Sequence, residues 1–147
     1  MIESSRFAVA VHALTLLSAE GRALTSEHIA GSVNTNPVVI RRVLAALRKA
    51  RLVGSKGGAG GGWHLRRAPE AITLRDVYRS VEGPELFAFP PHAPNPACPV
   101  GSTIQVALAK EFERALQGME ASLAKSTIAG MLRQTAAGES RRRVRNL

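Results

Sequence analysis

The sequence predicts a mainly α-helical fold that carries one small β-hairpin and continues into a long C-terminal helix. Three observations support this prediction. Apolar residues recur at intervals of three and four in several segments, which is the spacing of an amphipathic helix. Two short extended runs flank a glycine-rich stretch at residues 57–62, as in a hairpin. A proline-rich stretch at residues 84–99 separates these elements from the last helical pattern.

Length and charge narrow the class of protein. The chain has 147 residues, 45% of them hydrophobic, which suits one moderate domain with an appendage. A formal net charge of +9 indicates a polyanionic partner, although composition alone does not separate DNA from a membrane surface. No stretch approaches the roughly 20 apolar residues that span a bilayer, and no export signal is evident. We therefore expect a cytoplasmic protein, in agreement with its single cysteine.

The first two helices are expected to begin at capping residues. Ser4 or Ser5 can cap a first helix that ends at Gly21, a residue type favoured just after a helix. Thr25 can cap a short second helix that ends at about Gly31 to Val33. Only a few residues separate this second helix from the next helical pattern.

The third helix is expected from Pro37 to about Ala50. Thr35 or Asn36 supplies the N-cap, and proline is well tolerated in the first turn. The expected buried stripe consists of Val39, Ile40, Val43, Leu44 and Leu47. Basic residues lie largely off this stripe, at Arg41, Arg42, Arg48 and Lys49.

The third helix belongs to a stretch that contains no acidic residue. From His28 to Pro69 the chain holds eight of its 20 Lys and Arg residues and no Asp or Glu. A run of one sign favours a surface that faces a polyanion, and double-stranded DNA is the partner we expect. A short helix, a tight turn and a basic helix form the helix-turn-helix order, whose second helix fits the major groove. By itself this fragment also fits an ordinary helical hairpin.

The segment after the basic helix favours the first of these interpretations. Leu52–Val53 and Trp63–Leu65 are extended, and the glycines between them can approach a surface closely. Two strands after a helix-turn-helix make a wing. A nucleotide-binding loop is the alternative for the glycines, but no helix opens directly after them and no Gly-Lys-Ser or Gly-Lys-Thr is present. A fourth helix is expected next, with Thr73 and Asp76 spaced as a capping box.

The chain is expected to divide into four parts. These are a winged helix-turn-helix DNA-binding domain at 1–83, a connector with Cys98 at 84–101, a dimerisation helix at 102–132 and a disordered basic tail at 133–147. The helix carries a long apolar stripe at Ile104, Leu108, Phe112, Ala115, Leu116, Met119, Leu123, Ile128 and Met131. Such a stripe favours packing against a second copy of the chain, or folding back over the first helix, or both. The tail is expected to add nonspecific DNA affinity.

One series of residues runs through these elements and carries a family resemblance: Ala30, Leu47-Arg48-Lys49-Ala50, Leu52-Val53, Ser55, Gly60-Gly61-Gly62 with the aromatic after them, Leu65, Pro69, Ile72-Thr73-Leu74 and Asp76-Val77. The series resembles the Rrf2 family of bacterial winged helix-turn-helix transcription regulators over about residues 1–132. The resemblance implies a homodimer that places each recognition helix in a major groove of a roughly palindromic operator and each wing at an adjacent minor groove.

The resemblance also assigns roles to residues of the basic stretch. The start of the recognition helix falls where family members contact bases, and Arg48 falls where a backbone contact is expected. Where the family usually has an arginine in the wing, this chain has Gly57, so the minor-groove base contact of that arginine is not carried over. Lys56 stands one place earlier, and we expect it to contact a phosphate. The expected DNA contacts are Thr35, Asn36, Pro37, Val38, Arg41, Arg42, Arg48, Lys56, Gly57 and Gly58.

Cys98 is the candidate for signal sensing. Cluster-binding members of the family carry three cysteines in the connector, whereas this chain has one, so we expect no iron-sulfur cluster, metal or other cofactor. Cys98 precedes the expected long helix, and helix N-termini lower the pKa of a thiol. Two interpretations remain: a thiol that responds to an oxidant or other effector, and an unreactive one.

The sequence thus predicts a DNA-binding transcriptional regulator, a homodimeric repressor in our interpretation. The alternative is a protein-interaction module that uses the same fold to bind another protein. An enzyme is not expected, because no group of Asp, Glu, His and Cys residues shows catalytic or ligand spacing.

Overall fold

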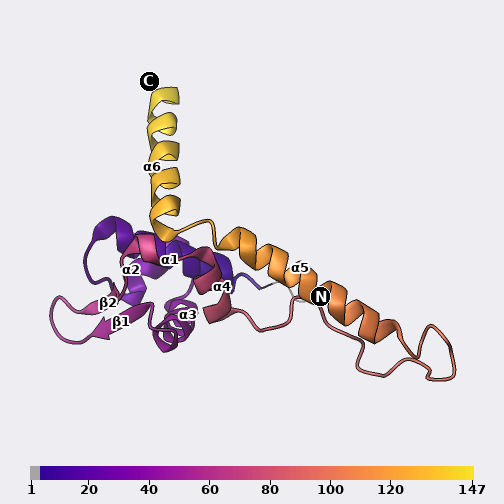
Figure 1. Cartoon of the computed structure of the whole chain (residues 1–147). Helices are drawn as coiled ribbons and strands as arrows, with labels where there is room; N and C mark the ends of the chain where they lie inside the picture. Colours follow the sequence, from indigo (N-terminus) through magenta and orange to yellow (C-terminus); the bar gives the residue numbers. More distant parts are fainter. Residues whose placement is uncertain (1–3) are drawn as a thin grey trace.

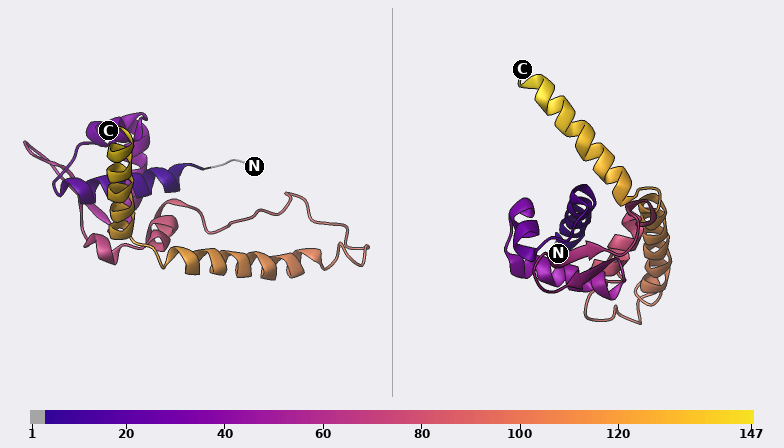
Figure 2. Two further views of the ribbon diagram at one scale, coloured as in Figure 1. Left: turned by 90° about the horizontal axis from the view of Figure 1, so that it is seen from above. Right: turned by 90° about the vertical axis from the view of Figure 1, so that its left-hand side faces the viewer.

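The computed structural model describes residues 4–147 and consists of a compact head with two helices projecting from it (Figure 1). The head contains α1 (Arg6–Glu20), α2 (Ser26–Val33), α3 (Pro37–Lys49), β1 (Val53–Lys56), β2 (Gly62–Leu65) and α4 (Leu74–Val81). After the connector, α5 (Ile104–Leu123) and α6 (Ile128–Arg145) run in different directions, as Figure 2 shows from two further sides. The predicted fold class, mainly helical with one hairpin, is confirmed.

Helix boundaries in the head follow from local side-chain chemistry. The Thr25 hydroxyl accepts a hydrogen bond from the His28 backbone N–H at 3.1 Å and so begins α2. At α4 the capping box is complete, since Thr73 accepts from the Asp76 N–H and Asp76 accepts from the Thr73 N–H. Gly21 ends α1 with a left-handed φ of 62°. These caps were all readable in the sequence.

The core of the head joins all four of its helices to the hairpin. Ile40, Val43, Leu44 and Leu47 of α3 are buried there as expected. Val39 is an exception: 37% of it stays exposed, so its inclusion in the buried stripe was wrong. The helix turns Val39 to the outside because a stripe centred on residues 40, 44 and 47 leaves position 39 at its edge.

The hairpin is held to the head by a third extended segment. β1 and β2 pair antiparallel, from Val53 opposite Leu65 to Lys56 opposite Gly62. Leu24 then pairs with Trp63 on the other edge of β2, through backbone hydrogen bonds of 2.9 and 2.7 Å. Gly62 allows this close approach, since a Cβ there would lie 2.4 Å from the Leu24 carbonyl oxygen and its φ is 134°. Gly62 is thus needed for packing of the hairpin against Leu24.

The expected single helix over residues 102–132 is two helices, and this prediction was wrong. The chain turns extended at Thr127, which caps α6 by accepting a hydrogen bond from the Gly130 N–H. The same segment is anchored to the head, because Leu74 N–H donates to the Ser126 carbonyl and Ile128 N–H donates to the Ile72 carbonyl, both at 2.9 Å. Ile128 is fully buried in the head core. Burial of that one side chain ends the long stripe and redirects the chain.

The basic tail expected at residues 133–147 to be disordered is instead helical as far as Arg145. Its composition explains the helix: alanine, glutamate and arginine have high helix propensity. Arg143 also pairs with Glu139 at 3.1 Å across one turn, and basic residues in the last turn complement the helix dipole.

Helix α5 is fixed to the head through α4. The Arg79 guanidinium donates two hydrogen bonds to the Glu120 carboxylate, at 2.9 and 2.7 Å. These hydrogen bonds from Arg79 are the main reason that the pKa of Glu120 lies below its ordinary value. Arg79 itself is about half exposed. The first turns of α6 pack along α1, whereas the element that α5 contacts most is α4. The sequence left open that the long apolar stripe folds back over the first helix. Only the last residues of the stripe, which belong to α6, do so.

Candidate nucleic-acid interface

The start of α3 presents both polar and apolar groups to solvent. Asn36 caps the helix, since its Oδ1 accepts a hydrogen bond from the Val38 backbone N–H at 2.9 Å. Its amide NH₂ stays available for a base or phosphate. Pro37 stands at the first helical position, and Val38 is 45% exposed. An exposed valine beside a polar cap suits the thymine methyl group and its neighbouring base edges.

Arg41 is held by an acidic residue that lies one position outside the acid-free stretch. Its Nη2 donates to Oε1 of Glu27 at 2.6 Å, which links α3 to the first turn of α2. A backbone hydrogen bond at Glu27, followed by the one from Arg41, keeps the pKa of Glu27 below its ordinary value. Both side chains are more than half exposed, so the pair is easily exchanged for a stronger partner such as DNA. The sequence gives no local signal for this pair, because fourteen residues separate Glu27 from Arg41.

Arg48 connects the recognition helix to the wing. Its guanidinium donates to the Ser55 hydroxyl at 3.3 Å and lies 5.5 Å from the centre of the Trp63 ring. The Trp63 indole N–H in turn donates to the Ser26 hydroxyl at 3.1 Å. Arg48 is exposed and can still reach a phosphate, but these contacts also make it a support for the wing.

The wing tip, residues 57–61, consists of glycine and alanine, and Lys56 precedes it at the end of β1. Lys56, Gly57 and Gly58 are all exposed, and Gly58 has a φ of 81°. Gly61, by contrast, packs tightly, because a Cβ there would lie 2.3 Å from the Lys56 carbonyl oxygen. An open hollow of about 480 Å³ lies beside the tip, and Arg22 and His28 contribute to its lining. Arg22 had not been singled out in the sequence, since only the tertiary fold brings residue 22 beside the wing.

The structure therefore brings the expected contact residues onto two neighbouring elements. α3 and the hairpin lie on the same side of the head, with α6 rising on the other side (Figure 1). Thr35 and Pro37 are half-buried, and the other members of the set are exposed: Asn36, Val38, Arg41, Arg42, Arg48, Lys56, Gly57 and Gly58. Their roles on DNA stay predictions.

Known proteins with the same pattern decide the family. The model of the Rrf2 family, described as iron-dependent transcriptional regulators, matches residues 3–134. The chain belongs to the Rrf2 family. It is 46% identical over 126 residues to YwnA of Bacillus subtilis, an HTH-type transcriptional regulator by name, over 85% of this chain and 92% of YwnA.

Solved structures of this Rrf2 protein's relatives have the same fold. A crystal structure described as that of a DNA-binding protein is 42% identical, with a TM-score of 0.71 over 87% of this chain and 99% of that one. IscR of T. potens is 26% identical, with a TM-score of 0.65 over 92% of this chain and 88% of its own. The chain is therefore a transcriptional regulator with a winged helix-turn-helix fold, and its class is non-enzymatic.

The iron in the family's description does not fit the residues of this chain. Between residues 4 and 147 no three His, Cys, Asp or Glu side chains gather closely enough to hold a metal ion. Cys98, the single cysteine, is exposed, and an iron-sulfur cluster takes several thiolates or their substitutes. Separately, no helix within the described residues combines the length and apolar character that crossing a bilayer requires.

Proposed function

We propose that this Rrf2 regulator is a homodimeric repressor that binds a roughly palindromic operator. The observation that carries the proposal is the basic surface formed by the start of α3 and the wing, two elements that themselves contain no acidic residue. α3 enters the major groove, where Val38 and Arg41 read bases and Arg42 and Arg48 contact phosphates. Lys56 reaches a phosphate beside the adjacent minor groove, and the exposed glycines let the wing approach it.

Helix α5 supports the homodimer. None of its residues is buried in the single chain, although it carries the long apolar stripe. The connector and α4 cover it in part: Phe87 and Phe89 pack against Phe112 with ring centroids 4.9 and 5.3 Å apart, and α4 contacts the end of α5 near Glu120. A second copy of α5 is the partner that this stripe fits, because two heads fixed to paired helices would face two half-sites together.

Selection of bound duplexes from random-sequence DNA tests the proposal. The expected result is enrichment of one inverted repeat, whose half-sites are bound together by one dimer. Protein that enriches no sequence, and that heparin removes as readily from every duplex, would contradict it. In that case the protein-interaction alternative would take its place.

We also propose that Cys98 makes operator binding responsive to oxidants. Cys98 is exposed in the turn before α5, where its N–H donates to the Asn95 carbonyl and its carbonyl accepts from the Ser102 N–H. Backbone N–H groups of Gly101 and then Val100 lower the pKa of its thiol. In the reaction we envisage, the thiolate attacks a low-molecular-weight disulfide, forms a mixed disulfide and releases one thiolate. The added group would disturb the connector that joins the head to α5.

A Cys98→Ser variant tests this response. The lowered pKa raises the thiolate fraction at neutral pH, so we expect Cys98 to react with iodoacetamide at lower pH than an ordinary thiol does. We expect oxidised glutathione to lower operator binding by the wild-type protein and to leave Cys98→Ser unchanged, as measured by fluorescence anisotropy. An equal loss of binding in both proteins would remove Cys98 from the proposal.

A further inference from the structure

The second half of α6 forms a basic arm, defined as residues 135–147, that lies outside the part shared with the family. The Rrf2 model ends at residue 134. In the arm every residue but Gly138 is exposed, and Val144 is 71% exposed, so the arm does not pack on the head. The views in Figures 1 and 2 agree that α6 carries it away from the side of the head formed by α3 and the wing.

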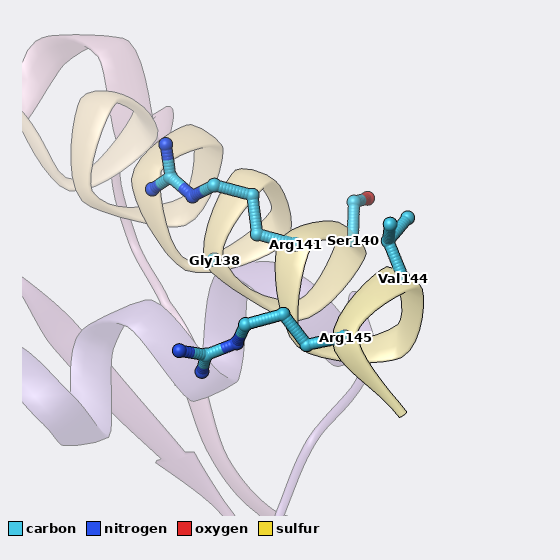
Figure 3. A pocket seen from close by; sticks show the side chains of 5 residues that line it. All are labelled: Gly138, Ser140, Arg141, Val144 and Arg145. Atoms are coloured by element: carbon cyan, nitrogen blue, oxygen red, sulfur yellow. The ribbon is translucent and has the colours of Figure 1, made fainter. Parts of the chain in front are cut away.

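The arm concentrates positive charge. It contains Arg141, Arg142, Arg143 and Arg145 and a single acidic residue, Glu139. Glu139 pairs with Arg143, and among the described residues no acidic group pairs with the other three arginines. Figure 3 shows that Arg141 and Arg145, one turn apart, extend their guanidinium groups to the same side of the helix. The helix therefore presents two parallel cationic forks on one face.

Two such forks fit the phosphates of a nucleic-acid backbone. Guanidinium groups hydrogen-bond phosphate oxygens in a bidentate manner, and an ordered helix holds them ready for that contact. Helix-dipole stabilisation accounts for basic residues in the last turn, but Arg141 stands before that turn.

The arm points away from α3 and the wing, so a straight duplex bound by those two elements does not extend to it. At roughly 1.5 Å per residue, Arg141 lies about 20 Å along α6 from Ile128, where the helix leaves the head. That direction is away from α3. We propose that the arm binds a second DNA duplex, so that the regulator bridges two DNA segments. The inference rests on the proposed DNA binding by the head and adds a second, sequence-independent site.

A bridging assay with the full chain tests the inference. A biotinylated duplex taken from the selected pool is bound to beads, the protein is added, and capture of a fluorescent duplex of unrelated sequence is measured. For the Arg141→Gln/Arg145→Gln variant we expect capture to fall about tenfold at moderate salt, because two phosphate contacts are lost. Binding of the first duplex, measured in the same samples, should stay within about twofold of wild type.

A matched control comes from α5. Lys110 and Arg114 are exposed, have the same spacing as Arg141 and Arg145 and lie off the apolar stripe. Lys110→Gln/Arg114→Gln removes the same charge but leaves the arm unchanged. We therefore expect this variant to capture the second duplex as wild type does. A chain ended at residue 134 should lose capture while circular dichroism melting shows the head folded.

Three outcomes would overturn the inference. One is equal capture by wild type and the Arg141→Gln/Arg145→Gln variant. Another is loss of capture to the same degree in the α5 control, which would make net charge the cause. The third is competition by polyglutamate as strong as by DNA, which would assign the arm to an acidic protein surface. Failure of wild-type protein to bind the first duplex would instead contradict the proposed function.

Discussion

Arg41→Ala is expected to weaken binding to the selected operator by about 10- to 100-fold, since one bidentate base contact contributes roughly 1–3 kcal/mol of discrimination. Binding to a scrambled duplex should change by much less, because that duplex offers Arg41 no matching base. Lys49→Ala is the control, with the same charge change on the exposed side of the last turn of α3. Fluorescence anisotropy on both duplexes measures the ratio. Equal losses on the two duplexes would make Arg41 a phosphate contact.

The ion pair with Glu27 gives this prediction a second test. Arg41 must leave or share the Glu27 carboxylate, 2.6 Å away, when it turns to a base. In Glu27→Gln the arginine loses a competing charge near DNA, so we expect tighter binding to scrambled duplexes and lower discrimination. If Glu27→Gln bound both duplexes as wild type does, the pair would have no part in DNA reading.

The order of elements in the head could be predicted because its signals are local. Thr25, Asn36 and Thr73 satisfy N–H groups two or three residues away, and a reader of the sequence sees both partners of each bond. The same holds for Gly21 after α1. Helix boundaries set by such short-range contacts appear in the sequence and in the structure at nearly the same residues.

The break between α5 and α6 could not be assigned with the same ease. From Leu123 to Ile128 the apolar spacing is five, which departs from the helical rhythm, and Ser126–Thr127 is a capping sequence. Those signals were weak beside a stripe that otherwise continued. The deciding contact is between Ile128 and the head core, more than fifty residues earlier at Ile72. Tertiary burial overrode the local pattern.

The candidate site shows the same division. The basic face of α3 and the glycine tip were visible as residue types in order, whereas the partners of those residues were not. Glu27 beside Arg41 and Trp63 beside Arg48 meet only in the fold. The glycines also have two different roles, which the sequence alone does not distinguish. Gly61 and Gly62 pack closely against the backbone of neighbouring segments, whereas Gly57 and Gly58 are open to solvent.

Ala115→Glu is expected to disrupt the proposed dimer with little effect on the single chain. Ala115 belongs to the apolar stripe of α5 but is exposed in the chain alone, and glutamate is a good helix former. Buried in a paired interface, the unpaired carboxylate would cost several kcal/mol, enough to raise the dimer dissociation constant by about 100-fold or more. Sedimentation velocity over a range of protein concentrations measures this change.

Ala121→Glu places the same charge on the opposite face of the same helix, where Ala121 is also exposed. If α5 pairs with its copy, Ala115→Glu should lower operator affinity by roughly 100-fold. In the intact dimer, binding of one head holds the second head close to the other half-site, and a monomer lacks this gain in effective concentration. Ala121→Glu should keep it. Equal dimerisation by the two variants would mean that the stripe is not the interface. Arg79 and Glu120, which fix α5 to the head, would then have no role in spacing the two recognition helices.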